Sequence, residues 1–267
     1  MQVSNGTDKR KEIEKPEAQM IRINVQDVGK VYSTGTVALE NIDLAIEDGE
    51  FVSVLGPSGC GKSTLLRIMA SLDHATSGKI DIVGSGIAAK DALPFAVVFQ
   101  EVSIYPWMKV RDNIEFAFDS LSMPRAEVRK RVDQQLELVG LSKFAKAYPH
   151  QLSGGMKQRV AVARAFAVDP PVLFMDEPFG SLDEQTRVGL AGELLQIWER
   201  TRKTVVFVTH GIEEAVSLAD RVVVLSKSPG RIKEIIPIDF PRPRDPVKLR
   251  GEPKFGEYVV RIWDLLR

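Results

Sequence analysis

One short segment carries the residue types and the spacing of a phosphate-binding loop. Residues 56–63 read GPSGCGKS and match the pattern G-x-x-x-x-G-K-[ST], between an apolar stretch and a helical one. The glycines allow the backbone to curl so that its N–H groups point inward at phosphate oxygens. Lys62 can reach the β- and γ-phosphates as a mobile point charge, and Ser63 can bind Mg²⁺ through its hydroxyl. This phosphate loop predicts the binding of a nucleoside triphosphate.

Two adjacent carboxylates follow a second apolar stretch. Asp176 and Glu177 come directly after residues 172–175, which read VLFM. Carboxylates at the carboxyl end of a parallel strand lie where ligands bind in open α/β sheets. Asp176 suits a role in binding Mg²⁺, whereas Glu177 suits a general base that activates an attacking water. In a chain with a phosphate loop, the pair indicates nucleotide hydrolysis rather than a solvated acidic loop.

A second anion site is predicted between these two segments. Residues 152–159 read LSGGMKQR, so that a serine and two glycines precede a run with helical apolar spacing. The N–H groups at a helix N-terminus are suited to bind anions. Because a protein with one nucleotide rarely needs two such sites, the economical interpretation is that the second serves the nucleotide of a neighbouring chain.

Cys60 lies inside the phosphate loop, next to the expected helix. A thiol near a helix N-terminus can have a lowered pKa. We therefore expect alkylation of Cys60 to block nucleotide binding. The plainer interpretation is a small residue tolerated at a free position of the loop.

The elements that must position these residues alternate between strands and helices, which predicts an α/β fold with a largely parallel sheet covered on both faces. Apolar and alternating patterns predict strands at residues 21–25, 39–46, 51–55, 95–99, 172–175, 205–208 and 221–225. Helices are expected after the phosphate loop, behind Pro124 and over residues 183–200. The segment from about 101 to 165 is expected to be mostly helical and separate from the sheet.

The two ends of the chain differ from the middle. Residues 1–20 are polar and charged and are interpreted as a flexible leader. Residues 229–253 are rich in proline, so no long regular element is expected there. Residues 255–266 predict an amphipathic helix whose apolar face packs on its own domain or, alternatively, on a partner chain. That face comprises Phe255, Tyr258, Val259, Ile262, Trp263 and Leu266.

The composition excludes several classes of protein. The 267 residues include 36 Lys and Arg against 36 Asp and Glu, which gives no support for a nucleic-acid binder. A single cysteine excludes a disulfide framework, and an apolar fraction of 44% is too high for a disordered chain. No stretch approaches about 18 consecutive apolar residues, and no secretory signal is visible. These observations predict a soluble cytoplasmic protein.

These segments together resemble the ATP-binding-cassette (ABC) ATPases, because residues 152–159 are similar to the signature of that family. Gln100 resembles the family's Q-loop glutamine, which contacts Mg²⁺ and the attacking water. His210 resembles the switch histidine that senses the γ-phosphate, and Tyr32 resembles the aromatic residue under the adenine ring. Residues 181–183, Ser-Leu-Asp, resemble the D-loop.

The resemblance implies a P-loop NTPase cassette with a mostly parallel core sheet, an N-terminal β subdomain and a helical signature subdomain at about 101–165. The ATPase domain would span residues 21–230, and residues 231–267 would form a proline-rich tail and a C-terminal helix. The implied catalytic residues are Glu177, His210 and Gln100, and the implied Mg²⁺ ligands are Ser63, Gln100 and Asp176. The implied ATP contacts are Tyr32, Gly56, Pro57, Ser58, Gly59, Cys60, Gly61, Lys62, Ser63, Thr64, Ser153, Gly154 and Gly155.

Narrower features resemble the branch of importers for nitrate, taurine and aliphatic sulfonates. Met156 in the signature is one such feature, and the others are residues 105–108 (YPWM), 178–180 (PFG), 228–232 (SPGRI) and 240–244 (FPRPR). The departures from that branch are Tyr105 instead of Leu, Ser181 where Ala is common and Gly211 where Asp is usual.

The resemblance also implies cofactors and partners. The cofactors would be ATP and Mg²⁺, and a second ATPase chain would complete a dimer that sandwiches two ATP molecules. Two transmembrane permease subunits and an extracytoplasmic substrate-binding protein would complete the importer, without nucleic acid. The chain would lie peripherally on the cytoplasmic face of the membrane, with its helical region docked on the permease. Trp107 is a candidate for that contact, with a buried core position as the alternative.

Two other functions compete with transport. A soluble ABC ATPase that acts on nucleic acid or ribosomes would usually carry a long coiled-coil insertion or two cassettes, whereas only residues 101–152 separate Gln100 from Ser153 here. A non-hydrolysing regulatory subunit is disfavoured because Glu177 and His210 are both present.

Overall fold

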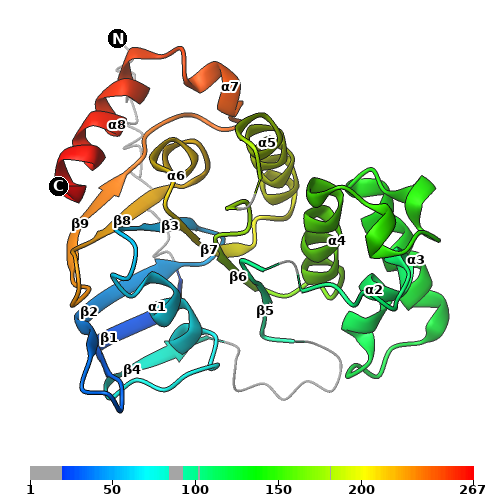
Figure 1. Ribbon diagram of the computed structural model, residues 1–267, viewed down its shortest axis with the longest axis horizontal. Helices are drawn as coiled ribbons and strands as arrows, with labels where there is room; N and C mark the ends of the chain where they lie inside the picture. Colours follow the sequence, from blue (N-terminus) through cyan, green and yellow to red (C-terminus); the bar gives the residue numbers. More distant parts are fainter. Residues whose placement is uncertain (1–19, 84–92, 102, 181) are drawn as a thin grey trace, which may run out of the picture.

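The computed structural model describes residues 20–267 apart from 84–92, 102 and 181, so the expected leader lies almost wholly outside the described residues. The described strands are β1 (Ile21–Val31), β2 (Val37–Glu47), β3 (Phe51–Leu55), β4 (Ser77–Ile82), β5 (Phe95–Val98), β6 (Val172–Asp176), β7 (Thr204–Thr209), β8 (Arg221–Leu225) and β9 (Ile232–Pro237). They form a six-stranded sheet in the order β5-β6-β7-β3-β8-β9 and a three-stranded sheet in the order β2-β1-β4 (Figure 1).

The six-stranded sheet forms the centre of the molecule. Strands β5, β6, β7, β3 and β8 pair in parallel, and β9 joins the edge antiparallel to β8. Every residue of β3, β6 and β7 is buried, because the sheet is covered on both faces. The expected α/β architecture is confirmed.

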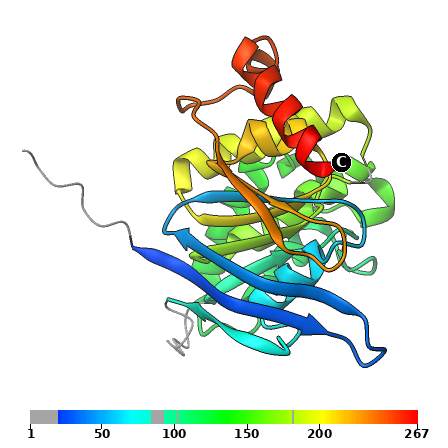
Figure 2. The same cartoon turned by 90° about the vertical axis from the view of Figure 1, so that its left-hand side faces the viewer.

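Two hydrophobic cores lie on opposite faces of this sheet, since successive side chains of a strand point to opposite sides. On one face, Val54, Phe174 and Val208 pack with α1 (Lys62–Met69) and the three-stranded sheet. On the other face, Met175 and Phe207 pack against α5 (Glu184–Thr201), α6 (Ile212–Leu218) and α8 (Pro253–Leu266). Figure 2 shows these layers, with α8 in red on one side of the sheet and β1 and β2 in blue on the other.

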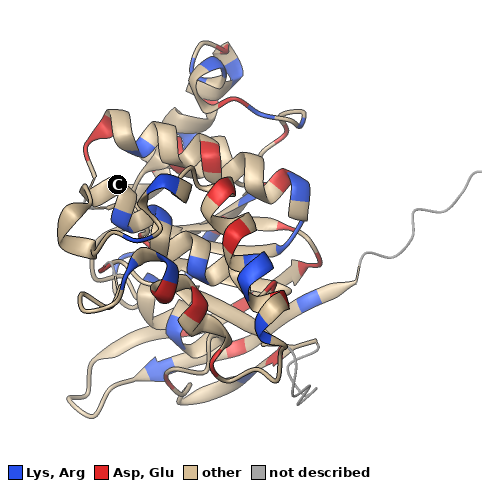
Figure 3. Cartoon of the chain, turned by 90° about the vertical axis from the view of Figure 1, so that its right-hand side faces the viewer, with Lys and Arg blue, Asp and Glu red and all other residues tan. Residues whose placement is uncertain are grey.

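The segment expected to be helical is helical throughout its described elements. It contains α2 (Val110–Glu115), α3 (Arg125–Leu138), α4 (Gly154–Ala167) and the short 3₁₀ helices Phe116–Phe118, Ser142–Phe144 and Pro149–Gln151. Its green helices lie to one side of the main sheet (Figure 1). Acidic and basic residues are interspersed along the helices of this side (Figure 3), in keeping with the balanced charge of the chain. None of the helices within the described residues is long and apolar enough to cross a membrane.

One strand prediction is wrong, and two of the described strands are not among the predictions. Strand β4 was not expected, because its segment SGKIDI is mostly exposed and lacks an apolar run. Residues 95–99 were expected to be buried, but β5 is an edge strand in which only Val98 is fully buried, and Phe99 is exposed. Strand β9 occupies part of the proline-rich region, where Pro237 is tolerated because it ends an edge strand.

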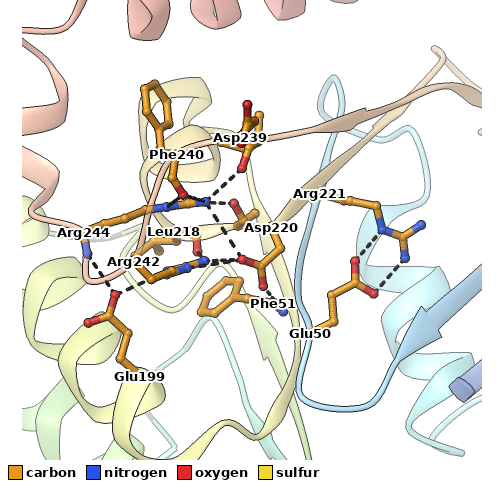
Figure 4. Close-up of polar contacts among 12 residues, drawn as sticks. Glu50, Phe51, Glu199, Leu218, Asp220, Arg221, Asp239, Phe240, Arg242 and Arg244 are labelled. Carbon is orange, nitrogen blue, oxygen red and sulfur yellow. Dashed lines mark hydrogen bonds and ion pairs between the residues drawn. The ribbon is translucent and has the colours of Figure 1, made fainter. Parts of the chain in front are cut away.

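The proline-rich segment after β9 is held on the core by two arginines (Figure 4). Arg242 donates to the Leu218 carbonyl and to Asp220 Oδ1, each at 2.7 Å. The Arg244 guanidinium is buried and donates to the carbonyls of Ala219 at 2.7 Å and Ile238 at 2.9 Å. Burial lowers the pKa of Arg244 to about 10. These contacts fix the segment on the core, and the short helix α7 (Pro246–Leu249) connects it to α8.

Helix α8 packs on its own domain, as the first of the two interpretations predicted. Phe255 and Ile262 are buried, and Tyr258, Val259 and Leu266 are half-buried. Trp263 departs from that prediction, because 56% of its surface is exposed.

Candidate functional site

The phosphate loop connects the buried strand β3 to helix α1 through a backbone that requires glycine. Gly59 and Gly61 have left-handed φ values of 75° and 99°. A Cβ on Gly61 would lie 2.7 Å from the Leu39 side chain and 2.8 Å from the Ala38 carbonyl oxygen. No side chain caps α1, so the N–H groups of its first turn stay free for an anion.

Lys62 lies inside this loop with only 6% of its surface exposed. Its Nζ donates to the carbonyls of Gly56 at 2.9 Å and Pro57 at 3.1 Å, and it lies 3.9 Å from Glu177 Oε1. These carbonyl oxygens hold the Lys62 ammonium inside the loop. Phosphate oxygens are charged and are therefore stronger partners for this cation than the neutral carbonyls are.

The strand order explains how the remaining groups come together. Gln100 follows β5, Glu177 follows β6, His210 follows β7 and the phosphate loop follows β3. Because β5, β6, β7 and β3 are neighbours in one parallel sheet, their carboxyl ends lie side by side at one edge. Residues that lie far apart in the sequence therefore meet.

Glu177 is held by several neighbours. Its Oε2 lies 3.0 Å from His210 Nδ1 and accepts a 3.4 Å hydrogen bond from Gln100 Nε2. Its backbone N–H donates to the Val208 carbonyl at 2.9 Å, and its φ of 43° is left-handed. A non-glycine residue in this region costs about 1–3 kcal/mol, and such strain gathers at functional sites.

Asp176 faces the phosphate loop through Ser63, whose hydroxyl donates to Asp176 Oδ1 at 2.8 Å. Burial raises the pKa of Asp176, and the bond from Ser63 opposes that shift. The hydroxyl, the carboxylate and the nearby Gln100 amide are oxygen donors of the kind that Mg²⁺ prefers. The donor set therefore fits a magnesium ion.

A cavity of about 400 Å³ extends from Ser63, Gln100 and Glu177 to the aromatic residue expected under adenine. The Tyr32 hydroxyl lies 3.0 Å from Thr64 Oγ1. The cavity is lined by Tyr32, Thr36, Ala38, Ser58, Gly59, Gly61, Lys62, Ser63, Thr64, Gln100, Glu177 and Ser228. The sequence interpretation does not include Thr36, Ala38 and Ser228, although Ser228 lies in the SPGRI segment that resembles the importer branch.

Cys60 is a predicted site residue whose thiol pKa differs from the expectation. The thiol is buried, with 1% of the residue exposed, and burial raises its pKa. The expectation of a lowered pKa for the Cys60 thiol is therefore wrong, because desolvation outweighs the charge of Lys62. Its Sγ would lie 2.6 Å from a Cβ on Gly56, so the thiol fills the space beneath the loop.

The second glycine segment is not part of this cavity. Ser153 caps α4 by accepting a 3.3 Å hydrogen bond from the Met156 N–H. Gly154 is exposed, and a Cβ on Gly155 would lie 3.0 Å from the Thr186 side chain. Ser181 lies outside the described residues, whereas Asp183 caps α5 by accepting from the Thr186 N–H at 3.0 Å.

Trp107 lies on the surface of the helical region, with 70% of its surface exposed. Its ring centroid lies 5.5 Å from that of Tyr105, which in turn packs edge-on against Phe116. The alternative of a buried core tryptophan is wrong.

Comparison with known proteins decides the family. The sequence model described as ABC transporter matches residues 39–180, which contain the phosphate loop, Gln100, the signature and the two carboxylates. The chain belongs to the ABC transporter family. It has the family's α/β cassette fold, and it is an ATPase that binds and hydrolyses ATP.

Relatives of this ABC ATPase cover nearly all of it. It is 45% identical over 263 residues to an uncharacterised ABC transporter ATP-binding protein of Methanocaldococcus jannaschii, covering 97% of each chain. It is 43% identical to a nitrate import ATP-binding protein of Synechocystis, covering 92% of this chain and 96% of that protein. It is 48% identical to an aliphatic sulfonates import ATP-binding protein of Bacillus cereus, covering 83% and 88% respectively.

Solved structures agree with the fold. A dimeric bacterial ABC transporter cassette matches this ABC ATPase with a TM-score of 0.70 and 35% identity, covering 82% of this chain and 99% of that one. A dimeric cassette in a post-hydrolysis state with ADP and Pi matches with the same TM-score and 34% identity.

Proposed function

We propose that this ABC ATPase is the motor subunit of an importer for a small compound of the nitrate, sulfonate or taurine kind. Relatives at 43% and 48% identity are named as nitrate and aliphatic sulfonate import ATP-binding proteins. The identity to these relatives carries the importer assignment, and the unequal surroundings of the two glycine segments carry the proposed sharing of ATP between two chains. The phosphate loop lies in a cavity with Lys62 and Glu177, whereas Ser153–Gly155 lies outside it.

The chemistry follows from the contacts around the phosphate loop. Lys62 and the free N–H groups of α1 bind the phosphate oxygens. Glu177 accepts a proton from the attacking water, while His210 and Gln100 hold its Oε2 in position. Ser63 and Asp176 would hold Mg²⁺, with Gln100 nearby; the ion, when bound, neutralises negative charge on the phosphates.

The dimer follows from the second segment. In this proposal, each chain offers its phosphate loop to one ATP and its residues 153–155 to the ATP of the other chain. ATP then favours the closed dimer, because the nucleotide contacts both chains only in that state. Loss of the γ-phosphate after hydrolysis removes this bridge and reopens the dimer.

Transport requires partners, since none of the helices within the described residues could cross a membrane. We assign two permease subunits and an extracytoplasmic binding protein to the complex, with this chain peripheral on the cytoplasmic face. The exposed ring of Trp107, backed by Tyr105 and Phe116, is an anchor of the kind that dominates protein interfaces.

Trp107→Ala tests the importer assignment. In complexes reconstituted with the cognate permease and binding protein, we expect the variant to lose binding-protein-stimulated ATPase activity at least about tenfold and to co-purify poorly with the permease. Its basal ATPase activity should not change, because Trp107 lines no part of the nucleotide cavity. Trp263→Ala is the matched control, because Trp263 is also exposed but lies on α8. Full stimulation of Trp107→Ala would contradict the proposed docking.

A further inference from the structure

Tyr32, the aromatic residue expected under adenine, is held at its hydroxyl. Tyr32 directly follows β1, and its hydroxyl lies 3.0 Å from Thr64 Oγ1 on α1. Because α1 begins at Lys62, this contact fixes one end of the side chain relative to the phosphate loop. The hydroxyl, however, lies on the axis about which the ring turns, and this torsion is broad in tyrosine. A second contact is therefore required to fix the plane of the ring.

Lys30 makes that second contact. It lies on β1, two residues before Tyr32, and its ammonium lies over the Tyr32 ring, 5.1 Å from the ring centroid. A cation within about 6 Å of an aromatic face is attracted by the quadrupole of the ring. The attraction requires the face of the ring, and not its edge, to point at the ammonium. It therefore favours one orientation of the ring plane.

The Lys30 ammonium is itself held in place. Lys30 is buried, and its Nζ donates to Asp73 Oδ1 at 2.5 Å and to the His74 carbonyl at 2.7 Å. The bond from Lys30 lowers the pKa of the Asp73 carboxyl, so this carboxylate stays charged at neutral pH. Both partners lie in the segment between α1 and β4. The ammonium thus has a fixed position against which the ring can be oriented.

The position of Lys30 relative to the nucleotide cavity leaves one face of the Tyr32 ring for a base. Tyr32 lines that cavity, whereas Lys30, Asp73 and His74 do not. The ring therefore stands between the ammonium and the cavity. With 38% of its surface exposed, Tyr32 has room for a flat ring on the side of the cavity.

We propose that Lys30 is a positioning residue for ATP: its ammonium sets the plane of the Tyr32 ring, on which adenine then stacks. The proposal rests on the expected placement of adenine against Tyr32, and it does not depend on the importer assignment. The competing interpretation is a purely structural role of Lys30, as a tie between β1 and the segment after α1. The two interpretations differ in one respect, since a positioning role requires the Tyr32 ring and a structural tie does not.

The basal ATPase activity of the full chain tests the positioning role. Lys30→Met removes the ammonium and keeps a long, unbranched side chain. We expect KM for ATP to rise about three- to fivefold with kcat nearly unchanged, because Lys62 and Glu177 keep their places. Lys79→Met is the matched control, since Lys79 pairs with Asp81 on β4 and lines no part of the nucleotide cavity. KM should not change in this control.

A double variant separates the loss of the cation from the effect of an unpaired carboxylate. Lys30→Met leaves Asp73 without its charged partner, which destabilises the segment after α1. Lys30→Met/Asp73→Asn removes both charges and should show the same rise in KM. Melting temperatures establish that the variants are folded. An unchanged KM in the folded variants would overturn the proposal.

Tyr32→Leu completes the comparison. Loss of the ring should raise KM at least about fivefold, since the stacking of a base on an aromatic side chain contributes this much or more. In the Tyr32→Leu background, Lys30→Met should change KM by less than about 1.5-fold, because no ring remains to be oriented. The same rise in both backgrounds would assign Lys30 a structural role alone and would overturn the proposal. An unchanged KM in Tyr32→Leu would instead contradict the placement of adenine, and the proposal with it.

Discussion

Two helices of this molecule begin at glycine-rich segments, and their surroundings differ. Helix α1 begins behind Gly61 without a side-chain cap, and its first turn contains Lys62 and lies beside Asp176 and Glu177. Helix α4 begins behind Ser153, which caps it, and Gly154 is exposed. The backbone geometry for anion binding is present at both, but the groups that could perform hydrolysis are present at one.

This difference between α1 and α4 indicates which nucleotide each helix N-terminus binds. An uncapped helix start leaves N–H groups without partners, and a bound phosphate compensates for them. A capped start with an exposed glycine is stable by itself and offers a surface to another molecule. We infer that α1 holds the nucleotide of its own chain and α4 that of the partner. Three substitutions test this difference between the two helices.

Glu177→Gln should have the largest effect, because it removes the proton acceptor from the complete site while keeping its shape. We expect kcat for ATP hydrolysis to fall at least about 100-fold with ATP affinity nearly unchanged. Light scattering after gel filtration with ATP should show a dimer that persists. Glu137→Gln on the exposed face of α3 is the control. Near-normal turnover of Glu177→Gln would refute the general-base role.

Gly154→Glu should affect only the anion site at the N-terminus of α4. Gly154 is exposed, and an added Cβ would lie 3.6 Å from Leu182, so a side chain fits without strain. A carboxylate is also compatible with the N-terminus of α4, but it repels a phosphate of the partner's nucleotide. We expect ATPase activity to fall about tenfold or more, while the affinity of the isolated chain for ATP stays unchanged. Gly256→Glu on α8 provides the control, and weakened ATP binding by the monomer would contradict the division.

Ser153→Ala should have the smallest effect, because it removes the cap of α4 without blocking its surface. Loss of an N-cap costs about 1 kcal/mol, which lowers the melting temperature of a domain of this size by about 2–4 °C. ATPase activity should fall less than in Gly154→Glu, and Ser153→Thr should restore the stability. Thermal scans of the unchanged protein, Ser153→Ala and Ser153→Thr measure the melting temperatures. A loss of ATPase activity in Ser153→Ala as large as that in Gly154→Glu would assign a catalytic contact to the Ser153 hydroxyl.

The sequence was informative where a chemical role requires fixed residue types at fixed spacing. The phosphate loop and Glu177 could be located because each follows an apolar strand, and parallel strands end at one edge, whereas Gln100 and His210 were identified through the resemblance to the family. The buried strands β3 and β6 could be located for the same reason, since they are short, apolar and bounded by turns. The contacts of Gln100 and His210 with Glu177 follow from the strand order.

Features that depend on long-range packing were not predictable. Strand β9 owes its place to pairing with β8, and the proline-rich segment is held by Arg242 and Arg244, which a pattern search treats as polar surface. The pKa of Cys60 depends on how deeply the loop is covered, which its neighbours in the sequence do not reveal.

If each hydrolytic site is shared between two chains, mixing two inactive variants should restore part of the ATPase activity. Lys62→Ala disables the phosphate loop, and Gly154→Glu disables the partner-facing helix start. Equal amounts of the two give half heterodimers, each with one intact site, so we expect about a quarter of normal ATPase activity if chains pair at random. Activity no higher than the mean of the two separate variants would contradict the account.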